Sequence, residues 1–145
     1  GGKYLAEVMA EFMADEYYES GFDADIVTFV PMHEKKKRKR GYNQAEEIAR
    51  ALSGILELPL VDVLDRVKLT DNLAKLGKAE RAEAIDGAIA LNPGVKVKRK
   101  KILLVDDVFT TGATSNECAK VLKRAQSSKI FVLTFATGRF HAELY

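Results

Sequence analysis

The sequence predicts an α/β domain with a mostly parallel central sheet flanked by helices. Short apolar runs of strand length alternate with segments in which apolar residues recur every three or four positions, as in amphipathic helices. Glycine, proline and acidic residues separate these runs. The chain has 145 residues, of which 47% are hydrophobic and 30% charged, and this suits one globular domain over residues 1–145.

The first half of the chain is expected to form two helices and two strands. These elements cover residues 4–19 (helix), 26–30 (strand), 44–57 (helix) and 59–64 (strand). Pro31 closes the first strand, and Asn43 with Glu46 has the spacing of a capping box that starts the second helix. The inward stripe of the first helix is expected to contain Leu5, Val8, Met9, Phe12, Met13 and Tyr17.

The second half is expected to form a helix, a short extended piece, and then a strand, a helix and a strand. The expected ranges are 78–85, 88–91, 102–105, a helix that follows Gly112, and 129–136. Residues 129–136 are mainly β-branched or aromatic, which favours a further parallel strand. Cys118, the single cysteine, lies in the helix after Gly112 and is expected to be a small core residue.

Two runs of basic residues occur in a chain whose net charge is only +2. Lys35–Arg40 contains six consecutive cations and is expected to be a loop. Such a run is often merely solvated, but this one follows the carboxyl end of a strand, where open α/β sheets bind ligands. The second run, Lys96–Lys101, is expected to be a solvated approach to the strand over residues 102–105.

The clearest chemical signal lies between Ile102 and Glu117. An apolar run ends in Asp106 and Asp107, and the residues TTGAT follow before a helical pattern. Gly112 allows close backbone approach, and the free N–H groups at a helix start suit a phosphate. Carboxylates beside a phosphate would repel it unless they bind hydroxyl groups or a Mg²⁺-bound part of the same ligand. A sugar phosphate with free hydroxyls meets these requirements.

Two other interpretations fit part of this motif. A receiver domain also ends a strand in an acidic pair, but its pair lies near the start of the domain and no TTGAT loop follows it. Alternatively, the two carboxylates only cap the helix that follows them.

The residues VDDVFTTGAT resemble the signature with which type I phosphoribosyltransferases bind phosphoribosyl pyrophosphate (PRPP). The resemblance implies that Asp106 and Asp107 hold the ribose 2′- and 3′-hydroxyls, directly or through Mg²⁺. Mg²⁺ is the implied cofactor, bridged by the substrate near these two carboxylates. The residues implied to bind the 5′-phosphate are Thr110, Thr111, Gly112, Ala113 and Thr114.

The segment PMH, the basic run after it and RGYNQAE resemble the phosphoribosyltransferase-like domain of ComF-type competence proteins, and the resemblance covers almost the whole chain. It implies that the basic segment binds the pyrophosphate. The residues expected there are Met32, His33, Lys35, Arg38 and Arg40. The cysteine-rich zinc ribbon with which that family usually begins is absent from this sequence, and with one cysteine no zinc site is expected.

Two hypotheses of different class follow. In the first, the domain is a phosphoribosyltransferase that uses Mg-PRPP, transfers ribose 5-phosphate to a nitrogen acceptor such as a nucleobase or ammonia, and releases pyrophosphate. Purine-salvage relatives carry an acid where this chain has Thr110, so the acceptor is expected to need no strong protein base. In the second, the fold serves competence as a binding module with little catalysis.

The expected partners differ between these hypotheses. A transferase requires PRPP and the nitrogen acceptor, whereas a competence module would contact single-stranded DNA or DNA-uptake proteins; a homodimer is compatible with either. No apolar run approaches the roughly 18 residues that span a membrane, so no membrane partner is expected. The low cysteine content favours a cytoplasmic location.

Overall fold

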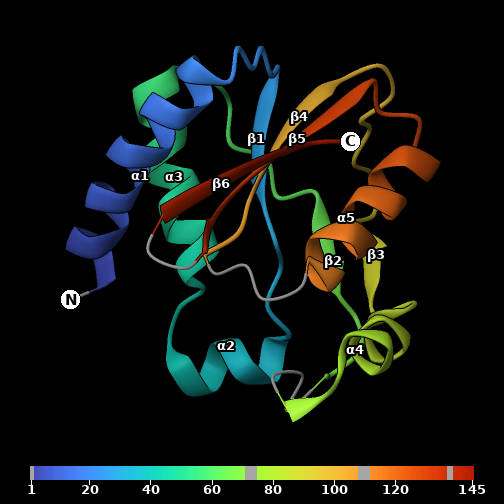
Figure 1. The fold of residues 1–145 in the computed structure, drawn as a ribbon. Helices are drawn as coiled ribbons and strands as arrows, with labels where there is room; N and C mark the ends of the chain where they lie inside the picture. The colour runs from blue at the N-terminus through green and yellow to red at the C-terminus, as the bar shows by residue number, and fades with distance from the viewer. Residues whose placement is uncertain (1, 71–74, 108–111, 137–138) are drawn as a thin grey trace.

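The computed structural model describes residues 2–70, 75–107, 112–136 and 139–145, and Figure 1 shows their fold. The elements in chain order are α1 (Gly2–Glu19), β1 (Ile26–Phe29), α2 (Glu34–Arg40), α3 (Gln44–Leu56), β2 (Leu64–Arg66), α4 (Lys78–Ile85), β3 (Ile89–Leu91), β4 (Lys101–Val105), α5 (Ala113–Arg124), β5 (Lys129–Ala136) and β6 (Arg139–Leu144). None of the described helices is long and apolar enough to cross a membrane.

The main sheet has the strand order β1-β4-β5-β6. β1 pairs with β4 and β4 with β5 in parallel, which confirms the predicted mostly parallel sheet. β6 was not predicted, and it adds an antiparallel edge next to β5. Because Phe29 is the register partner of Val105, the carboxyl ends of β1 and β4 lie side by side. The residues that follow these two strands therefore meet at one end of the sheet.

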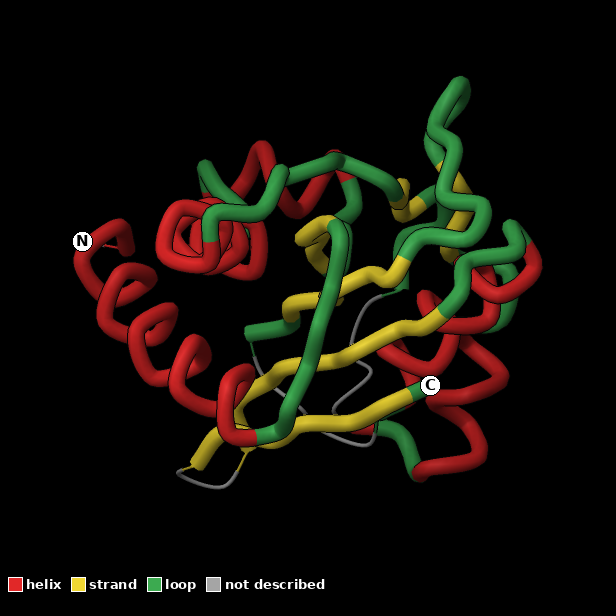
Figure 2. The backbone as a smooth tube through the Cα atoms, turned by 90° about the horizontal axis from the view of Figure 1, so that it is seen from above, coloured by secondary structure: helices red, strands yellow, loops and turns green. Residues whose placement is uncertain are grey.

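Helices cover both faces of this sheet (Figures 1 and 2). Leu103 and Val105 of β4 point toward α1 and α3, as do the corresponding side chains of β5. Ile102 and Leu104 point to the opposite face, where Cys118 and Leu122 of α5 pack. The alternation follows from the two-residue period of a strand, and both faces are apolar because both are covered.

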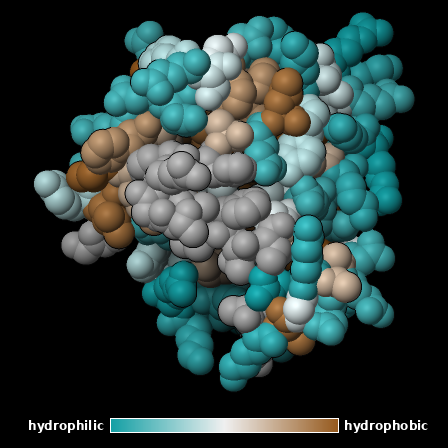
Figure 3. Space-filling model, in the orientation of Figure 1, coloured by the Kyte–Doolittle hydropathy of each residue, from teal (hydrophilic) through white to brown (hydrophobic). Residues whose placement is uncertain are grey.

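The inward face of α1 differs from the predicted one. Leu5 and Phe12 are 53% and 57% exposed, and Figure 3 shows apolar side chains on the surface over α1. The buried residues of α1 are Ala6, Ala10, Met13, Ala14 and Tyr17. The small alanine side chains face α3 across the helix pair, so the large apolar residues on the neighbouring stripe stay outside.

The basic run Lys35–Arg40 forms the helix α2 rather than the predicted loop. His33 is its N-cap, and its Nδ1 accepts a hydrogen bond of 3.1 Å from the backbone N–H of Lys35. At the other end Gly41 adopts a left-handed conformation with φ 94°, and its N–H donates to the Lys37 carbonyl at 2.7 Å. Lysine and arginine are good helix formers, so two well-formed caps are sufficient to define this short helix.

The second predicted strand also needs correction. Within residues 59–64, Leu60 forms only an isolated parallel bridge to Val27. The strand β2 begins at Leu64 and pairs with β3 in a separate two-stranded antiparallel sheet. This small sheet lies beside α5, and α4 also contacts α5. The second sheet brings the residues after β2 toward the same end of the molecule as α2 (Figure 1).

Candidate functional site

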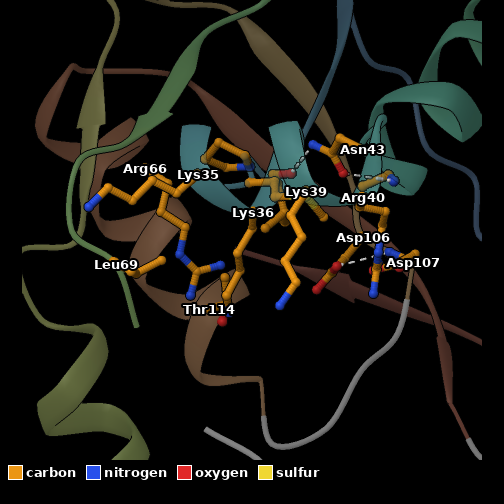
Figure 4. A pocket seen from close by; sticks show the side chains of 14 residues that line it. Lys35, Lys36, Lys39, Arg40, Asn43, Arg66, Leu69, Asp106, Asp107 and Thr114 are labelled. Atoms are coloured by element: carbon orange, nitrogen blue, oxygen red, sulfur yellow. Dashed lines mark hydrogen bonds between the residues drawn. The ribbon is translucent and has the colours of Figure 1, made fainter. Parts of the chain in front are cut away.

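A cavity of about 760 Å³ lies where β1 and β4 end, next to α2. Figure 4 shows its side chains: Asp106 and Asp107 lie on one side, Arg66 and Leu69 on the opposite side, and Lys36 and Lys39 between them. The lining residues are Val30, Pro31, Met32, Lys35, Lys36, Lys39, Arg40, Asn43, Ala45, Arg66, Leu69, Asp106, Asp107 and Thr114.

The acidic side of the cavity is held by β4 and α5. Asp106 directly follows β4 and is buried, and its backbone N–H donates to the Leu133 carbonyl at 3.0 Å. Its Oδ1 accepts from the backbone N–H of Asp107 at 2.9 Å, and its Oδ2 accepts from the Ser115 hydroxyl at 3.4 Å. Burial, and then the neighbouring charge of Asp107, raise the pKa of Asp106 to about 8.

The start of α5 lies beside this carboxylate pair. Gly112 is the N-cap of α5 with φ 79°, a left-handed conformation that favours glycine, and its carbonyl accepts from the Asn116 N–H at 2.8 Å. Ala113 is the first residue of the helix, and the side chain of Thr114 lines the cavity. Thr110 and Thr111, which the sequence assigns to the same phosphate site, lie outside the described residues.

The cations of α2 divide between two faces of the helix. Lys35, Lys36, Lys39 and Arg40 line the cavity. The other two form ion pairs away from it: Lys37 Nζ lies 3.1 Å from a Glu46 oxygen, and Arg38 Nε lies 3.6 Å from a Glu34 oxygen. The helical arrangement therefore places four cations of this run at the cavity and two on the outer surface of the helix.

Not all of the residues predicted for the pyrophosphate reach the cavity. Met32, Lys35 and Arg40 line it. His33 does not, because its ring caps α2, and the Arg38 side chain is 76% exposed beside Glu34.

Sequence reasoning missed several lining residues, among them Lys36 and Lys39 of α2 and three residues outside that helix, of which Asn43 is the first. Asn43 is buried where β1 and α3 meet: its Nδ2 donates to the Val30 carbonyl at 3.2 Å, and its Oδ1 accepts from the Ala45 N–H at 3.1 Å. Asn43 is the N-cap of α3, as predicted, but Glu46 does not complete the capping box, because its carboxylate pairs with Lys37 and Arg50. The other two are Arg66 and Leu69.

Arg66 and Lys36 are joined through Thr70. Arg66 Nη2 donates to the Thr70 hydroxyl at 2.6 Å, and Lys36 Nζ donates to the Thr70 carbonyl at 3.0 Å. Thr70 is buried, and burial of the guanidinium lowers the pKa of Arg66 from its usual value. A cationic group is therefore held on the wall opposite the carboxylates. Arg66 lies among other charged residues, Asp62, Asp65 and Lys68, so no local signal in the sequence pointed to it.

The donor set fits a Mg²⁺ ion that arrives with a phosphate-bearing ligand. Adjacent carboxylates supply hard oxygen ligands, and Mg²⁺ is commonly bound by one or two carboxylates together with substrate phosphates. Among the described residues, no group of three or more His, Cys, Asp or Glu side chains could hold a metal ion. A Mg²⁺ ion at Asp106 and Asp107 would therefore need ligand oxygens or waters to complete its coordination.

The fold is that of the type I phosphoribosyltransferases. A purine phosphoribosyltransferase from Pyrococcus horikoshii superposes with a TM-score of 0.56 and 22% identity, over 94% of this chain and 86% of that one. The glutamine PRPP amidotransferase from B. subtilis gives a TM-score of 0.56 and 21% identity, over 92% of this chain and 25% of that one. The model of the phosphoribosyl transferase domain family matches residues 6–142, and the chain belongs to this family.

Competence proteins are among the curated relatives. Competence protein F of Haemophilus influenzae is 34% identical over 105 residues, which cover 71% of this chain and 46% of that protein. Competence protein ComFC of Streptococcus pneumoniae is 30% identical over 135 residues, which cover 90% of this chain and 55% of that protein. The chain thus spans about half the length of these relatives.

Proposed function

We propose that this domain binds PRPP with Mg²⁺ and transfers its ribose 5-phosphate to a nitrogen acceptor, with release of pyrophosphate. One observation carries the proposal: a single cavity has two carboxylates on one wall and four cations of α2 on another. A ligand that presents both hydroxyl groups and phosphates matches these walls, and PRPP is such a ligand. Membership of the phosphoribosyl transferase domain family supports the same ligand.

The ribose phosphate would lie between β4 and α5. Asp106, which is protonated in the unliganded protein at neutral pH, would ionise when the ligand and Mg²⁺ bind. The carboxylates of Asp106 and Asp107 would then accept hydrogen bonds from the ribose hydroxyls, and their charge would favour positive charge on C1. The backbone N–H groups at the start of α5, from Gly112 onward, would bind the 5′-phosphate at the positive end of the helix dipole. Thr110, Thr111, Ala113 and Thr114 would contribute to the same phosphate site.

The pyrophosphate would lie against α2. As the nitrogen lone pair forms a bond to C1, the bond between C1 and the pyrophosphate oxygen breaks, and the electron pair leaves with the pyrophosphate. Lys35, Lys36, Lys39 and Arg40 would stabilise the negative charge that develops on this leaving group. Mg²⁺, when bound with the substrate, would supply further neutralisation of the same charge.

The acceptor would enter along the wall formed by Arg66 and Leu69. Leu69 offers an apolar surface to a planar ring, and the Arg66 guanidinium can donate to a carbonyl oxygen or an anionic group of the acceptor. Among the described lining residues, the only carboxylates are Asp106 and Asp107, which the ribose would occupy. The favoured acceptor therefore attacks through a nitrogen that needs no strong protein base.

Release of pyrophosphate tests this proposal. The protein is incubated with Mg-PRPP and a panel of acceptors, comprising nucleobases and ammonium, and pyrophosphate is measured with a coupled assay. We expect at least one acceptor to raise the rate above that of PRPP alone, and Arg40→Ala to reduce this rate. Equal pyrophosphate release with and without every acceptor would reject the transferase activity.

A role in DNA uptake is the second candidate, and the names of the relatives favour it. Two relatives are named competence proteins, and another is the DNA utilization protein YhgH of Escherichia coli, which is 28% identical over 109 residues. In this case the domain would bind PRPP with little turnover. PRPP binding by calorimetry, without acceptor-dependent pyrophosphate release, would identify such a module.

A further inference from the structure

A second basic surface lies at the amino ends of β4 and β5, at the opposite end of the sheet from the cavity. It is built by residues 96–101, which lead into β4, and by residues 123–129, which join α5 to β5. Neither residues 92–101 nor residues 120–130 contain an acidic residue. The cations of the two segments are Lys96, Lys98, Arg99, Lys100, Lys101, Lys123, Arg124 and Lys129.

Backbone contacts join the two segments into one surface. The Arg99 N–H donates to the Gln126 carbonyl at 2.9 Å, and the Ser128 N–H donates to the Lys100 carbonyl at 2.8 Å. Lys101 and Lys129 are register partners in the parallel pair β4–β5. The sequence indicated only a solvated approach to β4 at residues 96–101. The structure shows that this run meets the basic end of α5, at the upper right of Figure 1.

Most of these cations are exposed and are not neutralised. Lys101 is paired, because its Nζ lies 2.6 Å from an Asp23 oxygen, and Asp23 also interacts electrostatically with Lys129. The remaining six form no ion pair with another described residue: Lys96, Lys98, Arg99, Lys100, Lys123 and Arg124. This differs from α2, where the cations that face away from the cavity are paired with Glu46 and Glu34.

The backbone presents these cations from fixed positions. Val97 is 1% exposed and anchors the first segment in the core between two exposed lysines. Arg99 has φ 64°, a left-handed conformation that non-glycine residues adopt infrequently. Gln126, whose carbonyl accepts the Arg99 N–H, has a similar φ of 67°, so the two segments meet in a defined backbone geometry.

We propose that this surface binds the phosphate backbone of a nucleic acid duplex without reading its sequence. A regular polyanion matches several unpaired cations on one face, and phosphate contacts alone give sequence-independent binding. Neither residues 92–101 nor residues 120–130 carry an exposed aromatic or large apolar side chain. Binding of single strands relies on aromatic stacking, and insertion at a membrane surface relies on apolar side chains, so the duplex is the favoured partner.

This site is separate from the cavity and does not depend on the proposed transferase activity. The parallel strand β4 has five residues, Lys101–Val105, between the basic surface and Asp106. At about 3.3 Å per residue the two sites are roughly 15 Å apart at opposite ends of the sheet. The duplex and a ligand in the cavity can therefore bind at the same time.

Fluorescence anisotropy with a labelled duplex of about 30 base pairs and mixed sequence tests the proposal, at salt concentrations from about 50 to about 200 mM. The test variants are Arg99→Gln/Lys100→Gln and Lys123→Gln/Arg124→Gln. The control Lys3→Gln/Lys78→Gln removes the same charge from α1 and α4. Thermal unfolding of each variant verifies that it is folded.

The unmodified protein should bind the duplex, with a log–log salt dependence of about −0.9 per phosphate contacted. Each test variant should bind the duplex more weakly than the unmodified protein. Its log–log salt slope should be smaller in magnitude by about 1.8, which corresponds to the loss of two phosphate contacts. The control variant should keep the original slope. Inorganic pyrophosphate at a concentration that fills the cavity should leave the bound duplex in place.

Several results would overturn the proposal. The first is an absence of duplex binding at about 50 mM salt. The second is an equal reduction in the salt dependence of duplex binding in the control variant. The third is displacement of the duplex by pyrophosphate that occupies the cavity. Tighter binding of a single strand than of the duplex, or binding to phosphatidylserine vesicles in place of DNA, would likewise assign the surface to another partner.

Discussion

Replacing Asp106 with asparagine should stabilise the unliganded domain at alkaline pH, although the same residue is proposed to bind ribose. The Asp106 carboxyl is buried at the end of β4 beside Asp107. Burial and the adjacent negative charge raise its pKa from 3.8 to about 8. Asparagine has nearly the same shape and carries no charge at any pH, so it removes the cost of burying a carboxylate.

The direction of the effect follows from proton linkage. Because the pKa of Asp106 is higher in the folded than in the unfolded state, the folded protein holds this proton more tightly. The resulting stabilisation is complete below about pH 4 and is lost as the pH rises through about 8. The shift of about four pKa units corresponds to a free energy on the order of 5 kcal/mol, or about 1.4 kcal/mol for each pH unit within this window.

Urea unfolding of the wild type and Asp106→Asn at several pH values between about 5 and about 9 measures the effect. Both proteins are kept free of phosphate and metal, and the exposed Asp15→Asn on α1 serves as the control. The free energy of unfolding of Asp106→Asn relative to the wild type should rise with pH up to about 8 and then level off. A difference between the two proteins that does not change with pH would refute the assignment of a buried, protonated carboxyl at this position.

Three further predictions concern the phosphate sites and the acceptor wall. Gly112→Val should fold yet lose binding of ribose 5-phosphate measured by calorimetry, whereas Gly87→Val, at a comparable φ of 71° in a remote turn, should keep it. Arg40→Ala should weaken PRPP binding about tenfold or more. Arg38→Ala removes only an exposed ion pair and should change PRPP binding less than about threefold. Similar losses of PRPP affinity in the two variants would contradict the division of the α2 cations. Arg66→Lys should raise the acceptor KM in the pyrophosphate assay with little change in PRPP affinity, and a change in PRPP affinity alone would place Arg66 at the phosphates.

The local pattern of apolar and polar residues in the sequence was sufficient to predict most of the helices and strands. The helical spacing in α3 and α4, and the apolar runs of β4 and β5, gave their positions to within a few residues, because burial on one or both faces fixes these patterns. The Lys35–Arg40 helix was missed because an uninterrupted run of cations was interpreted as a solvated loop. Its caps, His33 and Gly41, were visible in the sequence but were not used.

Tertiary packing decided the features that pattern could not predict. The first helix contains two candidate apolar stripes, and only the presence of α3 selects the alanine-rich one. The same limit applies to the site. The sequence placed Asp106, Asp107 and Arg40, which lie next to strand or helix ends, at the cavity. It could not place Arg66, which reaches the cavity only because β2 and β3 form a second sheet.

Calorimetric titration with PRPP tests most directly whether the cavity binds this ligand through its carboxylate pair. The wild type, Asp106→Asn/Asp107→Asn and the control Asp15→Asn/Glu19→Gln, whose changes lie on the exposed face of α1, are titrated with and without Mg²⁺. Each lost charge-assisted hydrogen bond should cost about 1.5–3 kcal/mol, so the affinity of the Asp106/Asp107 variant should fall by about two orders of magnitude or more. The control should bind as the wild type does, in a Mg²⁺-dependent manner. Unchanged PRPP affinity in a folded Asp106→Asn/Asp107→Asn variant would contradict the proposed site.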